Sequence, residues 1–249
     1  MNITEKAYQD FRAHVLEAYP HEASGLIVKG RYIRSNYETA NPGNQFQIDP
    51  VLLVKHEKHI QAVLHSHPHK LTDQLTYDPR WPSEADMQCW MQGRVPWGIV
   101  STEGETVSDI LWMDDSVIPP LLGREYVNGL ADCYAVARDY YRLQGHDIPN
   151  LPRGMDWWEP KTNPVTGEVT PPRDILLENY KAFGFVEIKE KEARVGDAVL
   201  IRVRAQVVNH SGVITGEDEL THHVFRGLSR TDSLSHWKRF VVKYLRYQP

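Results

Sequence analysis

The chain is poor in the features that mark secreted, membrane-spanning and nucleic-acid-binding proteins. It has only two cysteines in 249 residues, Cys89 and Cys133, so free thiols are expected rather than a disulfide framework. No apolar run approaches the roughly 20 residues that span a bilayer. The N-terminal residues also lack a basic flank followed by an apolar core. We therefore expect a protein that is made and left in a cytosol, with no membrane span.

Positive charge is scarce as well. Lys and Arg number 28 against 33 Asp and Glu, which gives a net charge of −5, and no basic run occurs. This balance argues against nucleic acid or an anionic membrane as the main partner. With 41% hydrophobic residues the chain can build a proper core. We expect two domains, 1–115 and 124–249, joined by a linker at 116–123 that contains two prolines and a glycine.

The first half alternates helical and strand patterns, read from apolar spacing and from glycine and proline positions. Helices are expected over 5–18, over 85–92 and in a segment that begins at Asp49-Pro50. Strands are expected over 24–28, 32–34, 97–102 and 107–113, and one further strand is expected to end at His65. Within the helix 85–92, Cys89 is interpreted as a core residue, because free cysteine behaves mostly as a small hydrophobe.

The second half places helices before a run of strands, which indicates an α+β arrangement. Helices are expected from Cys133 and near 174–183, and strands over 186–189, 196–201, 212–215, 220–225 and 240–247. Between the helices lies a loop rich in Pro, Gly and Trp that is too long to be a mere connection. We expect its Trp157 and Trp158 to be exposed, where they would shape a substrate groove or contact a partner.

Two histidines mark a candidate metal site. His65 and His67 stand two apart at the end of an apolar strand, so both imidazoles project from the same face. In the downstream segment P-S-E-A-D, Ser83 marks a helix start that would fix Asp86 on the first turn. Three protein ligands with room for a water are typical of a catalytic zinc site. The alternative is structural, because Ser83 and Asp86 also make an ordinary helix cap.

These residues resemble the pattern of the JAMM/MPN metallopeptidases, in which an upstream Glu precedes H-x-H and then S-x-x-D. The resemblance implies an N-terminal α/β sandwich domain with a Zn²⁺ cofactor held by His65, His67 and Asp86. It also implies that Glu22, in H-E-A-S-G-L, is the general acid/base on the zinc-bound water, and that Ser83 steadies the oxyanion.

A second candidate site centres on Cys133, which begins a helix whose dipole favours the thiolate. A cysteine nucleophile needs a base. His210 starts one expected strand and His222, 222 − 210 = 12 residues on, lies on the next, so antiparallel pairing would bring the two imidazoles side by side. His223 faces away from His222, and which of the two completes the site stays open. A buried, inert Cys133 is the alternative.

D-C at a helix start, G-D before a strand and H-x-G-V resemble the NlpC-type papain-like cell-wall peptidases. This resemblance implies a papain-like α+β domain in which Cys133 is the nucleophile, His210 the base and His222 the orienting residue. A JAMM-like half followed by an NlpC-like half resembles the tail assembly protein K family of lambda-like bacteriophages over nearly the whole chain. Insertions at 70–80 and between Trp158 and Arg173 lie beside the two proposed sites.

Resemblance to that family implies phage tail-tip proteins as partners and a place in the host cytoplasm during assembly or at the virion tail tip. Three functions stay open. The first is a bifunctional peptidase whose thiol centre cuts the peptide stems of peptidoglycan and whose zinc centre cuts a protein bond. The second is a protease that matures a phage tail protein, and the third is a structural tail-assembly factor with idle catalytic centres.

Overall fold

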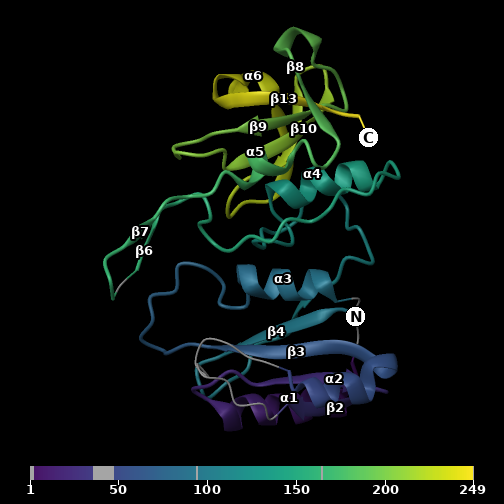
Figure 1. Cartoon of the computed structure of the whole chain (residues 1–249), viewed down its shortest axis with the longest axis vertical. Coiled ribbons are helices and arrows are strands. Elements are labelled where there is room, and N and C mark those ends of the chain that lie inside the picture. The colour runs from purple at the N-terminus through teal and green to yellow at the C-terminus, as the bar shows by residue number, and fades with distance from the viewer. Residues whose placement is uncertain (1–2, 36–47, 94, 164, 249) are drawn as a thin grey trace. The chain divides into compact units, whose positions relative to one another are not determined.

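The computed structural model describes residues 3–35, 48–93, 95–163 and 165–248. The chain forms two compact units. The first unit comprises Met1–Pro82 and Gln88–Val117, and the second comprises Ser83–Met87 and Ile118–Pro249. The change from one unit to the other after Val117 lies inside the stretch expected as a linker. Both units mix helices with a β-sheet (Figure 1).

The first unit is built on a five-stranded sheet in the order β2-β1-β3-β4-β5. Neighbouring strands are antiparallel except β3 and β4, which are parallel. The turn between β1 and β2 uses Lys29 and Gly30, both with positive φ, as a tight hairpin requires. The strands are β1 Ser24–Val28, β2 Arg31–Ser35, β3 Ile60–Pro68, β4 Trp97–Thr102 and β5 Leu111–Met113.

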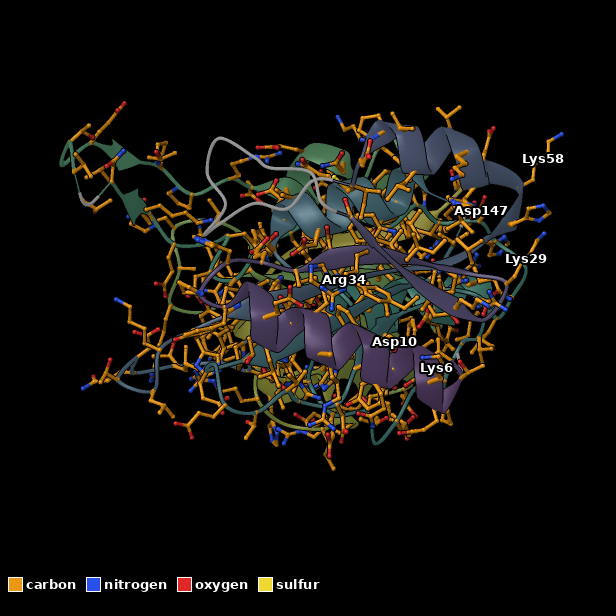
Figure 2. The ribbon with its side chains drawn as sticks, turned by 90° about the horizontal axis from the view of Figure 1, so that it is seen from below. Lys6, Asp10, Lys29, Arg34, Lys58 and Asp147 are labelled. Carbon is orange, nitrogen blue, oxygen red and sulfur yellow. The ribbon has the colours of Figure 1, made fainter. Side chains whose placement is uncertain are left out.

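Helix α1, Glu5–Ala18, packs its apolar side against this sheet, with Phe11 and Val15 fully buried in the core. Its opposite side carries the ion pair of Lys6 and Asp10, whose Nζ and Oδ1 atoms lie 3.1 Å apart (Figure 2). The other helices are α2 Pro50–His56, the short η1 Glu57–His59 and α3 Glu84–Gln92.

The second unit contains a six-stranded antiparallel sheet in the order β12-β11-β10-β9-β13-β8. Helix α4, Cys133–Arg142, lies against β10 and β11. The strands are β8 Phe185–Ile188, β9 Ala198–Ile201, β10 His210–Gly216, β11 Glu219–His223, β12 Ser229–Ser233 and β13 Val241–Tyr247. The remaining elements are the hairpin β6 Lys161–Thr162 and β7 Val169–Thr170, with α5 Ile175–Asn179, η2 Glu190–Glu192, α6 Leu234–Trp237 and η3 Lys238–Phe240.

Several expected elements differ from the structure. The strand expected over 107–113 shortens to β5, because the hydroxyl of Ser108 accepts a hydrogen bond from the Ser101 N–H and only Val107 bridges to Thr102. The helix expected over 174–183 is limited to α5. Strand β12 was not expected, since its sequence S-R-T-D-S has no apolar alternation. In the described part of the chain, no helix has the length and apolarity needed to cross a bilayer.

Two side-chain expectations are wrong. Cys89 is exposed rather than buried, because Asp86, Met87 and Trp90 occupy the buried side of α3 and leave the cysteine on the other. The expected exposure of the tryptophan pair is also wrong. Trp157 is buried in the core of the second unit, and Trp158 packs against that core with its ring at right angles to Trp157.

Candidate functional site

The two histidines of the first candidate site end strand β3. Their Nε2 atoms lie 3.1 Å apart, His65 is fully buried and His67 is partly buried. The Nδ1 of His67 lies 2.7 Å from the carbonyl oxygen of Pro79, in the segment read as an insertion. Because a carbonyl can only accept, Nδ1 carries the proton and the Nε2 lone pair of a neutral His67 is available to a ligand.

Helix α3 supplies the carboxylate. The structure brings one ligand atom each from His65, His67 and Asp86 within 4.8 Å of one another. Asp86 Oδ2 accepts from the Ser83 N–H at 2.8 Å, and the Ser83 hydroxyl accepts from the Asp86 N–H at 3.1 Å. The cap interpreted from the sequence therefore exists, and it orients the same carboxylate that faces the histidines.

Glu22 lies at the same edge of the first unit's sheet. In the antiparallel register, Ser24 pairs with His65, and Ser66 N–H donates to the Ala23 carbonyl at 2.9 Å. Glu22 precedes Ala23 and lies just before the paired residues of β1. Glu22 is partly buried there. Ser83, the residue expected to steady an oxyanion, is exposed at the start of α3.

The donor set suits a zinc ion. Two imidazole nitrogens that bind zinc at 2.0–2.1 Å with tetrahedral angles lie about 3.3 Å apart. The 3.1 Å between the Nε2 atoms of His65 and His67 is close to that separation. A nearby carboxylate completes a set of two nitrogens and one oxygen, which leaves a fourth position open as catalytic zinc sites do.

The second candidate site begins where helix α4 begins. Asp132 caps the helix, and its carboxylate accepts from the Ala135 N–H at 3.0 Å and from the Gly129 N–H at 2.9 Å. Arg153 donates to both oxygens of the same carboxylate, at 2.6 and 2.7 Å, and both side chains are buried. Burial alone would raise the pKa of Asp132, but the charge and hydrogen bonds of Arg153 hold it below its ordinary value. A buried ion pair thus fixes the residue before the thiol.

The surroundings of Cys133 act against the effect that the helix dipole has on its thiol. Burial and the adjacent Asp132 carboxylate raise the pKa of its thiol to about 11, while the backbone hydrogen bond from Ser211 and the charge of Arg153 act in the opposite direction. Ser211 follows His210 directly in β10. The thiol therefore lies at the start of the strand that carries the expected base.

His210 and His222 are side by side, as antiparallel pairing of β10 and β11 predicted. His210 Nε2 lies 2.7 Å from His222 Nδ1, and His222 Nε2 lies 3.1 Å from Asp232 Oδ2. Burial and the neighbouring His222 lower the pKa of His210 to about 3. Burial also lowers the pKa of His222, although Asp232 opposes this. Both imidazoles are therefore neutral at pH 7.

His223 lies on the opposite face of β11 from His222. Its Nε2–H donates to the Gly227 carbonyl at 3.1 Å, and its ring packs at right angles to Tyr126. Of the two adjacent histidines, His222 is the one bonded to His210. The sequence analysis missed Asp232, because it lies on the polar edge strand β12, which no hydrophobic pattern marks. It also missed Arg153, since no motif signals its pairing with Asp132.

The comparisons with known proteins show the family of the chain. The chain is 31% identical over 181 residues to the protein named tail tip assembly protein K of Escherichia phage lambda, covering 72% of this chain and 78% of that protein. The chain belongs to the tail tip assembly protein K family. The protein of the same name from Escherichia phage N15 is 28% identical over 255 residues, covering 99% of this chain and 96% of that one.

Residues 123–246 match the model of the NlpC/P60 family. That range contains Cys133, His210 and His222 and nearly coincides with the expected domain 124–249. A solved NLP/P60-family protein from Staphylococcus aureus aligns with 13% identity and a TM-score of 0.36, covering 95% of this chain and 60% of that one. This member of the tail tip assembly protein K family thus carries an NlpC/P60 peptidase-like domain in its second half.

Proposed function

We propose that the second unit is a thiol peptidase in which Cys133 is the nucleophile, His210 the base and His222 the residue that orients the base. The observation that carries this proposal is the hydrogen-bonded chain from His210 through His222 to Asp232, beside a helix that begins at the thiol. The match to the NlpC/P60 family supports the same assignment. Two buried histidines joined by a hydrogen bond are suited to proton transfer, whereas core packing alone does not require such a bond.

The chemistry follows from two neutral partners. Burial and Asp132 raise the pKa of the Cys133 thiol, and burial and His222 lower the pKa of His210, so a neutral thiol and a neutral imidazole are the favoured resting forms. The thiol proton passes to His210 as the sulfur attacks the substrate carbonyl carbon. His210 then returns this proton to the leaving amine as the C–N bond breaks, which leaves a thioester on Cys133. Water hydrolyses the thioester, with His210 accepting its proton, and the thiol is restored.

The substrate proposed for this centre is the peptide stem of peptidoglycan, as the resemblance to cell-wall peptidases implies. The family name indicates a role in assembling the tail tip, so tail-tip proteins are the proposed partners. A phage that cuts wall peptides at the tail tip would open a path through the cell wall. The competing targets are a phage tail protein that needs cleavage, or no target at all in a structural assembly factor.

Cys133→Ala tests the thiol proposal, and Cys89→Ala is its matched control, because Cys89 is the exposed second thiol of the chain. Purified wild-type protein and Cys89→Ala should release peptides from peptidoglycan, whereas Cys133→Ala should release none. Uncut precursor in tails assembled with Cys133→Ala, and no wall cleavage by wild type, would select the phage protein as the target. No wall activity with normal tails and normal infectivity would select the structural role.

We further propose that His65, His67 and Asp86 hold a zinc ion. Bound zinc would supply Lewis-acid chemistry toward a carbonyl. The Pro79 carbonyl keeps the Nδ1 proton on His67, and Ser83 orients the carboxylate of Asp86. Glu22 would accept and return a proton, as the JAMM/MPN resemblance implies. The JAMM/MPN resemblance supports this assignment, and zinc analysis of His67→Ala tests it.

A further inference from the structure

Asp232 ends the hydrogen-bonded chain that starts at His210. One of its oxygens, Oδ2, lies 3.1 Å from His222 Nε2 and accepts from the Trp237 indole N–H at 3.3 Å. Its other oxygen lies 2.9 Å from Arg230 Nε. Burial would raise the pKa of Asp232, but the hydrogen bonds from Arg230 and His222 bring it below its ordinary value. The side chain is therefore an ionised carboxylate at neutral pH.

An ionised carboxylate can only accept hydrogen bonds. This determines which ring nitrogen carries the proton in each of the two hydrogen-bonded histidines. His222 must carry its proton on Nε2 to donate to Asp232. The Nδ1 of a neutral His222 is then a lone pair, so the proton in the 2.7 Å contact belongs to His210 Nε2. A neutral His210 with its proton on Nε2 has its lone pair on Nδ1.

We propose that Asp232 is a positioning residue that fixes both histidines in these tautomers, so that His210 Nδ1 is the atom that receives the thiol proton. The inference rests on the proposed thiol function, which it deepens by assigning the proton positions before reaction. Without the carboxylate, His222 can hold its proton on Nδ1 and donate to His210 Nε2. The proton of His210 then sits on Nδ1, and the base is blocked.

Of the charged groups near the rings of His210 and His222, Asp232 is the group that selects the tautomer. His222 faces Asp232, Arg230, His210 and His223. His210 faces His222 and His223, with Asp132 and Asp232 at longer range. Asp132 is bound to Arg153, and His223 donates to Gly227. Among these carboxylates, Asp232 is the one in hydrogen-bond contact with a ring of the chain.

Nitrogen-15 NMR of the wild-type protein tests the proposal without any variant or substrate. Imidazole nitrogen shifts distinguish a protonated from an unprotonated ring nitrogen. At pH 7 we expect protons on His222 Nε2 and His210 Nε2, with Nδ1 unprotonated in both. A proton on His210 Nδ1 would overturn the proposal. This outcome is independent of catalysis, so a protein with the expected tautomers but no peptidase activity would contradict the proposed function alone.

Asp232→Asn, made in a Cys89→Ser background so that one thiol remains, supplies the functional arm. We expect the iodoacetamide alkylation rate of Cys133 at pH 7 to fall about 100-fold, with a larger share of His210 protonated on Nδ1. Asp232→Glu should recover part of the rate. Asp218→Asn is the matched control, since Asp218 accepts from Ser233 and Ser235 outside the chain. Unchanged tautomers and an unchanged rate in Asp232→Asn would contradict the proposal.

Discussion

The two histidine pairs of this chain are built from different geometry and suit different chemistry. His65 and His67 lie two apart on one strand, so both rings leave the same face and direct two Nε2 atoms at one point. His210 and His222 lie on neighbouring strands, so the Nε2 of one meets the Nδ1 of the other. In the first pair, two ring nitrogens point toward one place, as the ligands of a cation do. In the second pair, one ring donates a hydrogen bond to the other.

The carboxylate beside each pair completes the difference. The Asp86 carboxylate accepts a hydrogen bond from the Ser83 N–H, and its ligand atom lies within 4.8 Å of a ligand atom of each histidine. Asp232 contacts His222 at the end of the chain. A carboxylate between two imidazoles raises affinity for a metal, whereas one at the end of a row fixes where protons lie.

The largest effect is expected at the metal side. His67→Ala removes one of three ligands and should abolish stoichiometric zinc binding, measured as metal content after zinc loading and gel filtration. His69→Ala, two residues on in the same segment but outside the ligand group, should retain one zinc per chain. Equal zinc content in both variants would refute the metal assignment. Alkylation of Cys133 should be unchanged in both.

His210→Ala should slow the alkylation of Cys133 about 100-fold to 10,000-fold at neutral pH, the range that a general base contributes. Because burial and Asp132 raise the thiol pKa to about 11, the variant's rate should rise about tenfold per pH unit up to that value. Wild type should be far less dependent on pH above 5, since the pKa of His210 is lowered to about 3. Identical pH profiles would contradict the role of His210.

Arg153→Ala should destabilise the protein by about 3–5 kcal/mol in urea unfolding, because it leaves the Asp132 carboxylate buried without its partner. Arg142→Ala is the control. Its guanidinium pairs with Asp139 at 2.8 Å but is partly exposed, and Asp139 keeps Arg124 as a partner, so a loss of about 1 kcal/mol or less is expected. Equal losses would show that the Asp132–Arg153 pair does not fix the start of α4.

The smallest effect is expected at the corresponding cap of the first unit. Thr4 caps α1 as Asp132 caps α4, but its hydroxyl accepts only from the Ala7 N–H, at 3.2 Å, near the surface. Thr4→Ala should cost about 1 kcal/mol of unfolding free energy, whereas Thr4→Ser should cost less. A loss above that of Arg153→Ala would overturn the contrast between an exposed cap and a buried one.

Much of the fold could be predicted from local pattern. The helix over 5–18, the hairpin at Lys29-Gly30 and the strand 97–102 each follow from spacing and turn residues, and the structure confirms them. Strand β12 could not be predicted, because an edge strand without an apolar face carries no alternation signal. Because the sequence of this strand is polar, sequence analysis did not identify Asp232, which ends the hydrogen-bonded chain from His210 through His222.

The candidate sites were predicted to the extent that geometry follows from strand periodicity. The alternation of side chains predicted that His65 and His67 would converge and that only one of His222 and His223 would meet His210. Charge states depend on three-dimensional burial, which the sequence does not report. For that reason the helix dipole suggested a thiolate at Cys133, while burial of the thiol and the Asp132 carboxylate beside it raise the thiol pKa. Cys89 and Trp157 were misplaced for the same lack of tertiary information.

The most direct test is to treat wild-type protein in turn with iodoacetamide and with a zinc chelator, and to measure the peptides released from peptidoglycan. The two-centre account predicts that alkylation of Cys133 abolishes release and that removal of the metal leaves it unchanged. Release that survives complete alkylation of Cys133, or that disappears on chelation alone, would contradict it.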